Sequence, residues 1–181
     1  HCSSAASDVY KRQVERFIKM SQTTLDIKEP GLNVLPPGVE RHVVNAGGLT
    51  GLQIFPDDEI EIINEEGNQI CEIICFDKDG KSELGILNQK ENCKKSFIKE
   101  LLKGKDESSL ITNLQLKKRN LDINKSKSSI LFDEQTPSGE KIKIKSKDKC
   151  YVIFAAPQNN MLVSEQNPSS DLTLFIKRYK I

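Results

Sequence analysis

Residues 57–79 read DDEIEIINEEGNQICEIICFDKD, and this stretch decides the fold of the 181-residue chain. It holds two apolar runs, residues 60–63 and 70–76, on either side of a polar segment. β-Branched and aromatic residues bounded by Asp, Asn and Gly are typical of strands joined by a tight turn. We therefore predict a central β-hairpin with Gly67 and Asn68 as its structural motif, in which Gly67 supplies the backbone freedom that the turn needs.

Short strands recur through the rest of the chain at the spacing of all-β folds. Strict alternation in residues 141–145 predicts a half-buried edge strand with its lysines toward water. The continuous apolar run at residues 150–156 predicts a central strand that is buried on both faces. Further strands are predicted at residues 41–44, 52–55, 82–87, 130–132, 161–163 and 172–179. The expected fold class is mainly β (α+β), a β-sandwich or distorted barrel of about eight to ten short strands.

One packed helix is predicted near residues 92–103. Its apolar stripe recurs at the helical period in Cys93, Phe97 and Leu101. Asn92 is the candidate N-cap. A second, short helix is expected after the capping residue Asp106, and it would use as its apolar face Leu110, Ile111 and Leu114.

The N-terminal residues 1–19 look non-native. Residues 1–13, HCSSAASDVYKRQ, resemble the translated adapter tails found in proteins assembled from environmental sequence reads. A short signal peptide is the competing interpretation, but the apolar core of such a peptide is missing. We therefore divide the chain into residues 1–19 as adapter or leader translation, 20–38 as an extended arm, and 39–181 as a single β-rich domain that is expected to be truncated on its C-terminal side.

Composition excludes several classes of function. The chain has 27 basic and 26 acidic residues, whereas a nucleic-acid binder would carry a basic excess gathered on one face. No apolar run approaches the ~18 residues of a membrane-spanning helix. Without a secretory signal, we expect a cytoplasmic protein whose cysteines are buried free thiols rather than disulfides. The native cysteines are Cys71, Cys75, Cys93 and Cys150.

No set of residues forms a sufficient catalytic constellation, so we predict no catalytic residue and no metal site. His42 is the only histidine outside the leader, and a nucleophilic mechanism needs a base next to its nucleophile. The carboxylates of residues 57–59 and 65–66 fall in predicted turns, where acidic residues favour the bend. The four native cysteines also lack the spacing of a zinc site.

The order of residues 60–72 resembles the urea carboxylase-associated domain family. It runs from an apolar strand through an acidic turn and Glu-Gly-Asn-Gln to a second apolar strand with a carboxylate three residues after the Gln. The turns Asn45-Ala46-Gly47 and Pro56-Asp57-Asp58 fit the family's order before this strand. The resemblance covers residues 36–178, with weaker support from 155–157 and 168–172.

Members of this family occur alone and also fused upstream of a glycine-cleavage T-like, folate-dependent aminomethyltransferase domain. The resemblance therefore implies that this chain is the non-catalytic accessory domain of such a protein of one-carbon metabolism. Its partner would be the downstream catalytic domain of the same polypeptide, beyond Ile181. Tetrahydrofolate would bind that catalytic domain, and no cofactor is expected in this segment.

The chain also departs from the family's pattern. Stand-alone members that resemble hydrolases carry a downstream His-Asp and Cys combination that is missing here, and Asn64 and Glu72 stand where the family often has aspartates. The alternative function is a stand-alone small-molecule hydrolase or ligand-binding domain, in which Gln69, Glu72 and His42 would contact the ligand. A third interpretation is an interaction module without a pocket.

Overall fold

A computed structural model describes residues 35–158 and 168–179. Its contacts divide the chain into two units, His1–Pro37 and Gly38–Ile181, and the fold below is that of the second unit. The predicted adapter segment, most of the predicted arm and the predicted strand at residues 161–163 lie outside the described residues.

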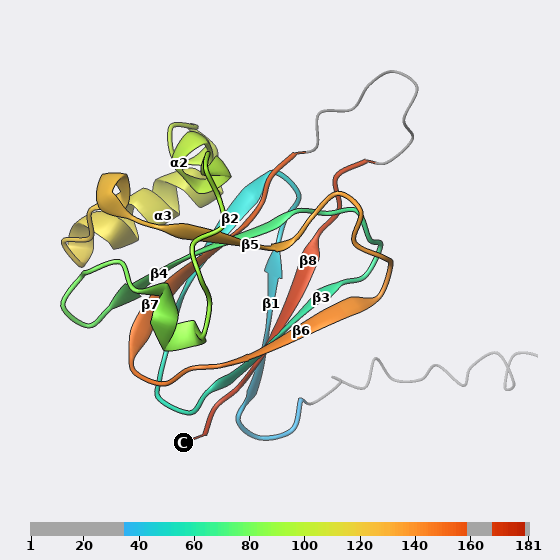
Figure 1. The fold of residues 1–181 in the computed structure, drawn as a ribbon, viewed down its shortest axis with the longest axis horizontal. Coiled ribbons are helices and arrows are strands. Elements are labelled where there is room, and N and C mark those ends of the chain that lie inside the picture. The colour runs from blue at the N-terminus through green and yellow to red at the C-terminus, as the bar shows by residue number, and fades with distance from the viewer. Residues whose placement is uncertain (1–34, 159–167, 180–181) are drawn as a thin grey trace, which may run out of the picture. The chain divides into compact units, whose positions relative to one another are not determined.

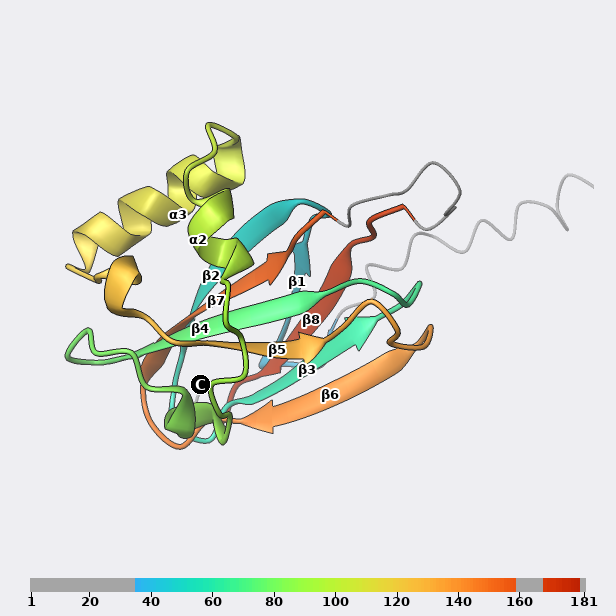
Figure 2. The ribbon, with the colours of Figure 1, turned by 45° about the horizontal axis from the view of Figure 1, so that its top comes forward.

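Eight strands of the described residues form two four-stranded sheets in which every pairing is antiparallel (Figures 1 and 2). This arrangement confirms the predicted mainly β fold class. The first sheet has the order β1 (Val39–Val44), β8 (Leu172–Lys177), β3 (Glu59–Asn64) and β6 (Glu140–Lys145). The second has the order β2 (Gly48–Ile54), β7 (Cys150–Ala156), β4 (Cys71–Asp77) and β5 (Ser128–Phe132).

The predicted central hairpin is wrong, although both of its strands exist. β3 pairs with β6 and β8, whereas β4 pairs with β5 and β7 in the other sheet. The segment between them therefore crosses from one sheet to the other. Both strands carry many apolar residues, which an isolated two-stranded ribbon could not bury. Each strand buries them as an inner strand of its own sheet.

The main core lies between the two sheets. Alternate residues of the inner strands point into it, among them Ile60 and Ile62 of β3 and Ile73 of β4, all fully buried. The other face of the second sheet is covered by helices and buries Ile74 and Phe76. The inner strand β7 is accordingly buried along its whole length, as its apolar run predicts.

The helix predicted near residues 92–103 is shorter than expected. α2 (Phe97–Leu101) begins after Ser96, whose Oγ accepts a hydrogen bond from Lys99 N. Asn92 is not its N-cap. The Asn92 side chain instead accepts from the backbone N–H of Ile130 at 2.6 Å and donates to its carbonyl at 3.0 Å, which ties it to the free edge of β5.

The helix after Asp106 exists and is longer than α2. α3 (Glu107–Lys118) is capped by the Asp106 carboxylate, which accepts from Ser109 N at 3.0 Å. Its predicted apolar face is wrong, because Leu110, Ile111 and Leu114 are 53%, 46% and 66% exposed. The side chains that α3 buries are those of Ser109, Thr112 and Leu116.

Two short 3₁₀ helices complete the described elements, Leu84–Leu87 and Ile123–Lys125. The first stands where a strand is predicted at residues 82–87, of which only Ser82 forms a bridge, to Phe76. None of the described helices is both long enough and apolar enough to cross a membrane.

Candidate functional site

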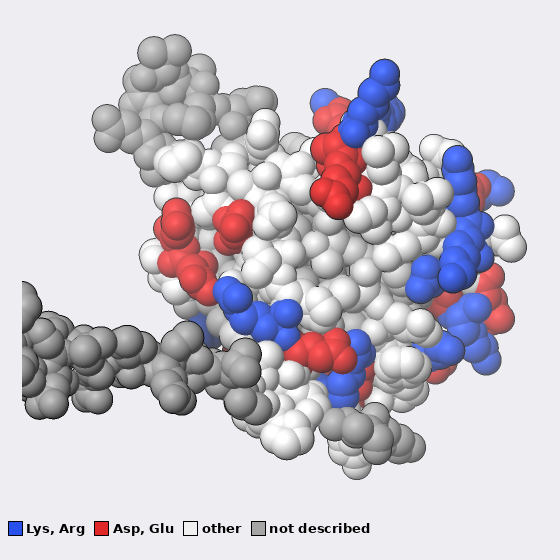
Figure 3. All heavy atoms as spheres, turned by 180° about the vertical axis from the view of Figure 1, so that it is seen from behind, with Lys and Arg blue, Asp and Glu red and all other residues white. Residues whose placement is uncertain are grey.

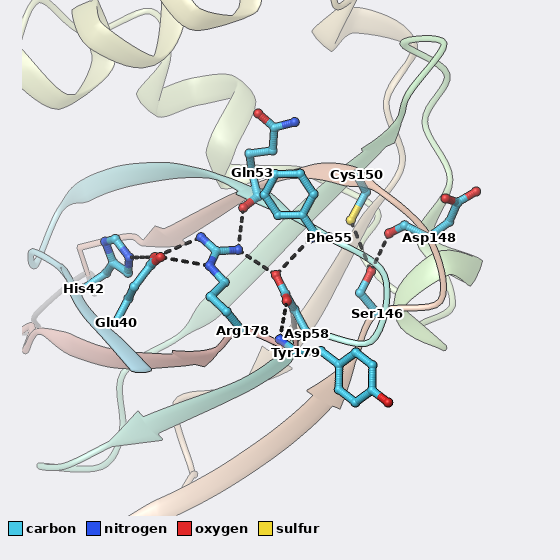
Figure 4. A network of polar contacts seen from close by, with 10 residues as sticks. All are labelled: Glu40, His42, Gln53, Phe55, Asp58, Ser146, Asp148, Cys150, Arg178 and Tyr179. Atoms are coloured by element: carbon cyan, nitrogen blue, oxygen red, sulfur yellow. Dashed lines mark hydrogen bonds and ion pairs between the residues drawn. The ribbon is translucent and has the colours of Figure 1, made fainter. Parts of the chain in front are cut away.

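Arg178, directly after β8, is the centre of a polar network (Figure 4). Its Nε and Nη2 donate to the two carboxylate oxygens of Glu40 on β1, at 2.9 and 2.8 Å. Its Nη1 donates to Asp58 Oδ2 at 2.6 Å and to the Gln53 carbonyl at 3.0 Å. The Arg178 side chain is only 16% exposed. Because Glu40 belongs to the first sheet and Gln53 to the second, Arg178 links the two sheets near the end of β8.

Asp58 is a buried carboxylate that closes the turn between β2 and β3. Its side chain is 1% exposed. Besides the Arg178 guanidinium, it accepts hydrogen bonds from the backbone N–H of Phe55 at 3.0 Å and of Tyr179 at 3.1 Å. The predicted turn role of residues 57–59 is thus correct for Asp58, which in addition holds the end of β8 in place.

His42 joins this network through Glu40. Its Nε2 lies 3.0 Å from Glu40 Oε2. The hydrogen bonds from Arg178 lower the pKa of Glu40 to about 2, and the hydrogen bond with His42 acts in the same direction. A carboxylate with so low a pKa is a weak base at neutral pH, whereas a general base works best with a pKa near the operating pH. The network is therefore suited to holding strands together rather than to proton transfer.

The lowered pKa of Glu40 predicts an acid-sensitive contribution to stability. Because the folded pKa lies below the ordinary value of 4.5, this contribution is fully present above about pH 4.5 and is lost as the pH falls toward 2. Urea unfolding measured across this range should show a smaller loss of unfolding free energy in Glu40→Gln than in the unmodified chain. Equal pH dependence of the two proteins would contradict the assignment.

Gln69 lies in a second network, at the opposite turn between β3 and β4. It is 1% exposed, and its Nε2 donates to the carbonyls of Ile70 and Pro157 at 3.1 and 2.8 Å. Its Oε1 accepts from Ser170 N at 2.8 Å, and its own carbonyl accepts from Asn64 Nδ2. Gln69 thus ties the crossing segment to the end of β7 and to the segment before β8.

The turn residues beside Gln69 have the conformation that the sequence predicts for Gly67. Gly67 and Asn68 both have positive φ, 80° and 57°. The Asn68 N–H donates to the carbonyl of Thr136 at 2.8 Å, which fixes the crossing segment against the loop between β5 and β6.

Glu72 belongs to a third set of contacts, between β4 and α2. It is fully buried, and its Oε2 accepts from the backbone N–H of Ile98 at 2.9 Å. Its Oε1 has no hydrogen-bond partner among the described residues. The structure therefore places His42, Gln69 and Glu72 in three separate networks, and their role as ligand contacts stays a prediction.

Two surface cavities lie elsewhere. One of about 330 Å³ is lined by Ile70, Phe97, Ile130, Asp133, Glu134 and Gln135. The other, of about 240 Å³, has Lys78, Arg119 and Lys149 among its lining residues. Neither lining includes the three predicted ligand contacts. Within the described ranges, no three His, Cys, Asp or Glu side chains are grouped so that they could hold a metal ion.

The four cysteines of the described residues are free thiols, as predicted. Cys71, Cys75 and Cys150 are buried as expected, whereas Cys93 is only half-buried. The hydrogen bond with Cys150, and then burial, raise the pKa of Cys75. Burial likewise raises the pKa of Cys71. Because the thiolate is the nucleophilic form, these two thiols are suited to packing rather than to reaction.

The sequence did not single out Arg178 and Glu40. They are 138 positions apart, and Arg178 and Asp58 are 120 positions apart, so no local motif connects them. The signals in the sequence were weak: Arg178 directly follows an alternating strand, and Glu40 lies within a short strand. Their meeting depends on the pairing of β1 with β8, in which Glu40 is opposite Ile176.

Comparison with known proteins gives one informative similarity. No family model matches the chain. A curated relative, the trimethylamine-oxide aldolase of Ruegeria pomeroyi, is 34% identical over 152 residues. The matched region is 84% of this chain but only 19% of that protein. The chain is therefore similar to one portion of a much longer enzyme.

Proposed function

We propose that this chain is a non-catalytic accessory β-sandwich domain of a larger enzyme related to trimethylamine-oxide aldolase. The observation that carries the proposal is the unequal coverage of the match, 84% of this chain against 19% of the relative. A similarity of this kind leaves most of the relative's length to hold a catalytic site. This chain would supply a folded module beside it.

The contacts of the polar residues support a structural role. Arg178 is shared by two carboxylates and a backbone carbonyl, and the Gln69 amide donates and accepts within the protein. Because the donors and acceptors of these side chains already form hydrogen bonds within the domain, few of them are available to bind a substrate. The pKa of Glu40 is also far below the range that general base catalysis requires.

The resemblance of residues 60–72 to the urea carboxylase-associated family refines the proposal. It supports a parent protein that is a folate-dependent aminomethyltransferase-like enzyme, with its one-carbon transfer domain beyond Ile181. Tetrahydrofolate would bind that downstream domain, so no residue of this chain is assigned to the cofactor. The present domain would then serve in substrate gating, docking or assembly.

The test compares this chain with its extended gene product. The gene is read beyond Ile181, and both proteins are purified and assayed for trimethylamine-oxide aldolase activity and for tetrahydrofolate binding by calorimetry. We expect activity and folate binding in the extended protein alone. A stop codon directly after Ile181, or activity in the 181-residue chain by itself, would overturn the proposal.

A further inference from the structure

The polarity of α3 is reversed relative to an ordinary surface helix. It is fastened to the sheet and to α2 largely by polar groups: Ser108 Oγ accepts from Leu49 N at 3.2 Å, and Asn113 Nδ2 donates to the Leu102 carbonyl at 2.8 Å. Tyr151 donates to the Gln115 side chain. A surface helix normally turns its apolar stripe to the core. Of the four large aliphatic residues of α3, only Leu116 is buried, whereas the other three, Leu110, Ile111 and Leu114, are exposed.

Four of the exposed residues of α3 form one seam. Glu107, Ile111, Leu114 and Lys118 are all exposed and follow one another at spacings of four, three and four residues. This spacing places them along a single line of the helix, as in the contact line of a coiled coil. Leu110 is exposed beside the seam and widens its apolar middle. In the view from behind, the side of the molecule on which α3 lies shows an uncharged area between acidic and basic side chains (Figure 3).

The seam is complementary to itself when it is read in reverse. Its order is acidic, apolar, apolar, basic. If a second α3 lies antiparallel along it, Glu107 of each copy is opposite Lys118 of the other, and Ile111 is opposite Leu114. A two-fold dimer requires this kind of match, in which residue i contacts j and j contacts i.

We propose that the α3 seam is a homodimer contact, in which a second copy of this chain packs its own α3 antiparallel against it. The apolar middle drives the association and the charged ends select the antiparallel direction. A helix of this length offers a line of only about 18 Å, so the dimer is reversible and dissociates on dilution. Because the contact involves this chain alone, it is independent of the activity proposed above.

The first test is sedimentation equilibrium of the 181-residue chain over a series of concentrations. We expect a monomer–dimer equilibrium in the unmodified chain, and loss of the dimer in Leu114→Glu and in the milder Leu114→Gln. Tyr179→Ser is the matched control, because Tyr179 is 65% exposed, close to the 66% of Leu114, but lies outside α3. A monomer at every concentration, or a dimer that survives both Leu114 variants, would overturn the proposal.

Charge reversal tests the antiparallel direction. Glu107→Lys and Lys118→Glu each turn two attractive pairs of the dimer into two repulsive ones, so each should weaken the dimer by about tenfold. The double variant restores opposite charges at both ends and should regain most of the lost affinity. Far-ultraviolet circular dichroism identifies any variant in which α3 itself is lost. A folded double variant that remains as weak as the single variants would exclude the antiparallel contact.

Discussion

Replacement of Arg178 by Met is expected to lower the free energy of unfolding by about 3–5 kcal/mol, because it leaves a buried carboxylate without its cation. Asp58 is 1% exposed and receives the shortest hydrogen bond of the network, 2.6 Å from Arg178 Nη1. The same change also releases Glu40, the second carboxylate that the guanidinium holds. Urea denaturation at neutral pH measures the effect directly.

The double variant Arg178→Met/Asp58→Asn is the control for this prediction. It removes the buried negative charge together with the cation, so it should be more stable than Arg178→Met alone. A loss below about 1 kcal/mol in the single variant would show that the pair behaves like an exposed ion pair. The Arg178–Asp58 pair would then contribute little to the stability of the sandwich.

The second large effect is expected at the crossing segment between the sheets. Gly67 has φ 80°, and a Cβ at this position would lie 2.6 Å from the backbone nitrogen of Ser138 and 3.0 Å from the carbonyl carbon of Pro137. Gly67→Ala therefore combines backbone strain with a clash against the main chain of a neighbouring loop. Together these should lower the free energy of unfolding by about 2–4 kcal/mol.

Gly139 offers a matched control for the two causes. It has φ 77°, but a Cβ there would meet no atom within 4 Å. Gly139→Ala should therefore show the conformational cost alone, about 1–2 kcal/mol. Chemical denaturation of both variants separates strain from collision. If the two glycine variants lose equal stability, the contact of Gly67 with residues 137 and 138 contributes nothing.

The secondary structure was predictable where a local pattern met an ordinary environment. The alternation of residues 141–145 belongs to an edge strand with outward lysines, and the apolar run at 150–156 belongs to an inner strand. The capping role of Asp106 was also correct. These features depend on the period of the chain and on the chemistry of one side chain, both of which the sequence states directly.

The prediction for the helix after Asp106 was wrong in an informative way. Its aliphatic residues have helical spacing, so they predicted the buried face, but the sheet instead receives Thr112 and Leu116. Helical periodicity shows which residues share one face of a helix, but it does not show whether that face packs against the core. In this chain the stripe is exposed, and the surface so formed is the basis of the proposed dimer.

The sequence by itself determined that the chain is mainly β, where most of its strands run, and that Gly67 occupies a special backbone position. Only the tertiary structure decided that the two strands of residues 57–79 belong to different sheets, and that Arg178 meets Glu40 and Asp58. The physical reason is that strand pairing and buried ion pairs join residues more than a hundred positions apart, and local propensity carries no information about such partners.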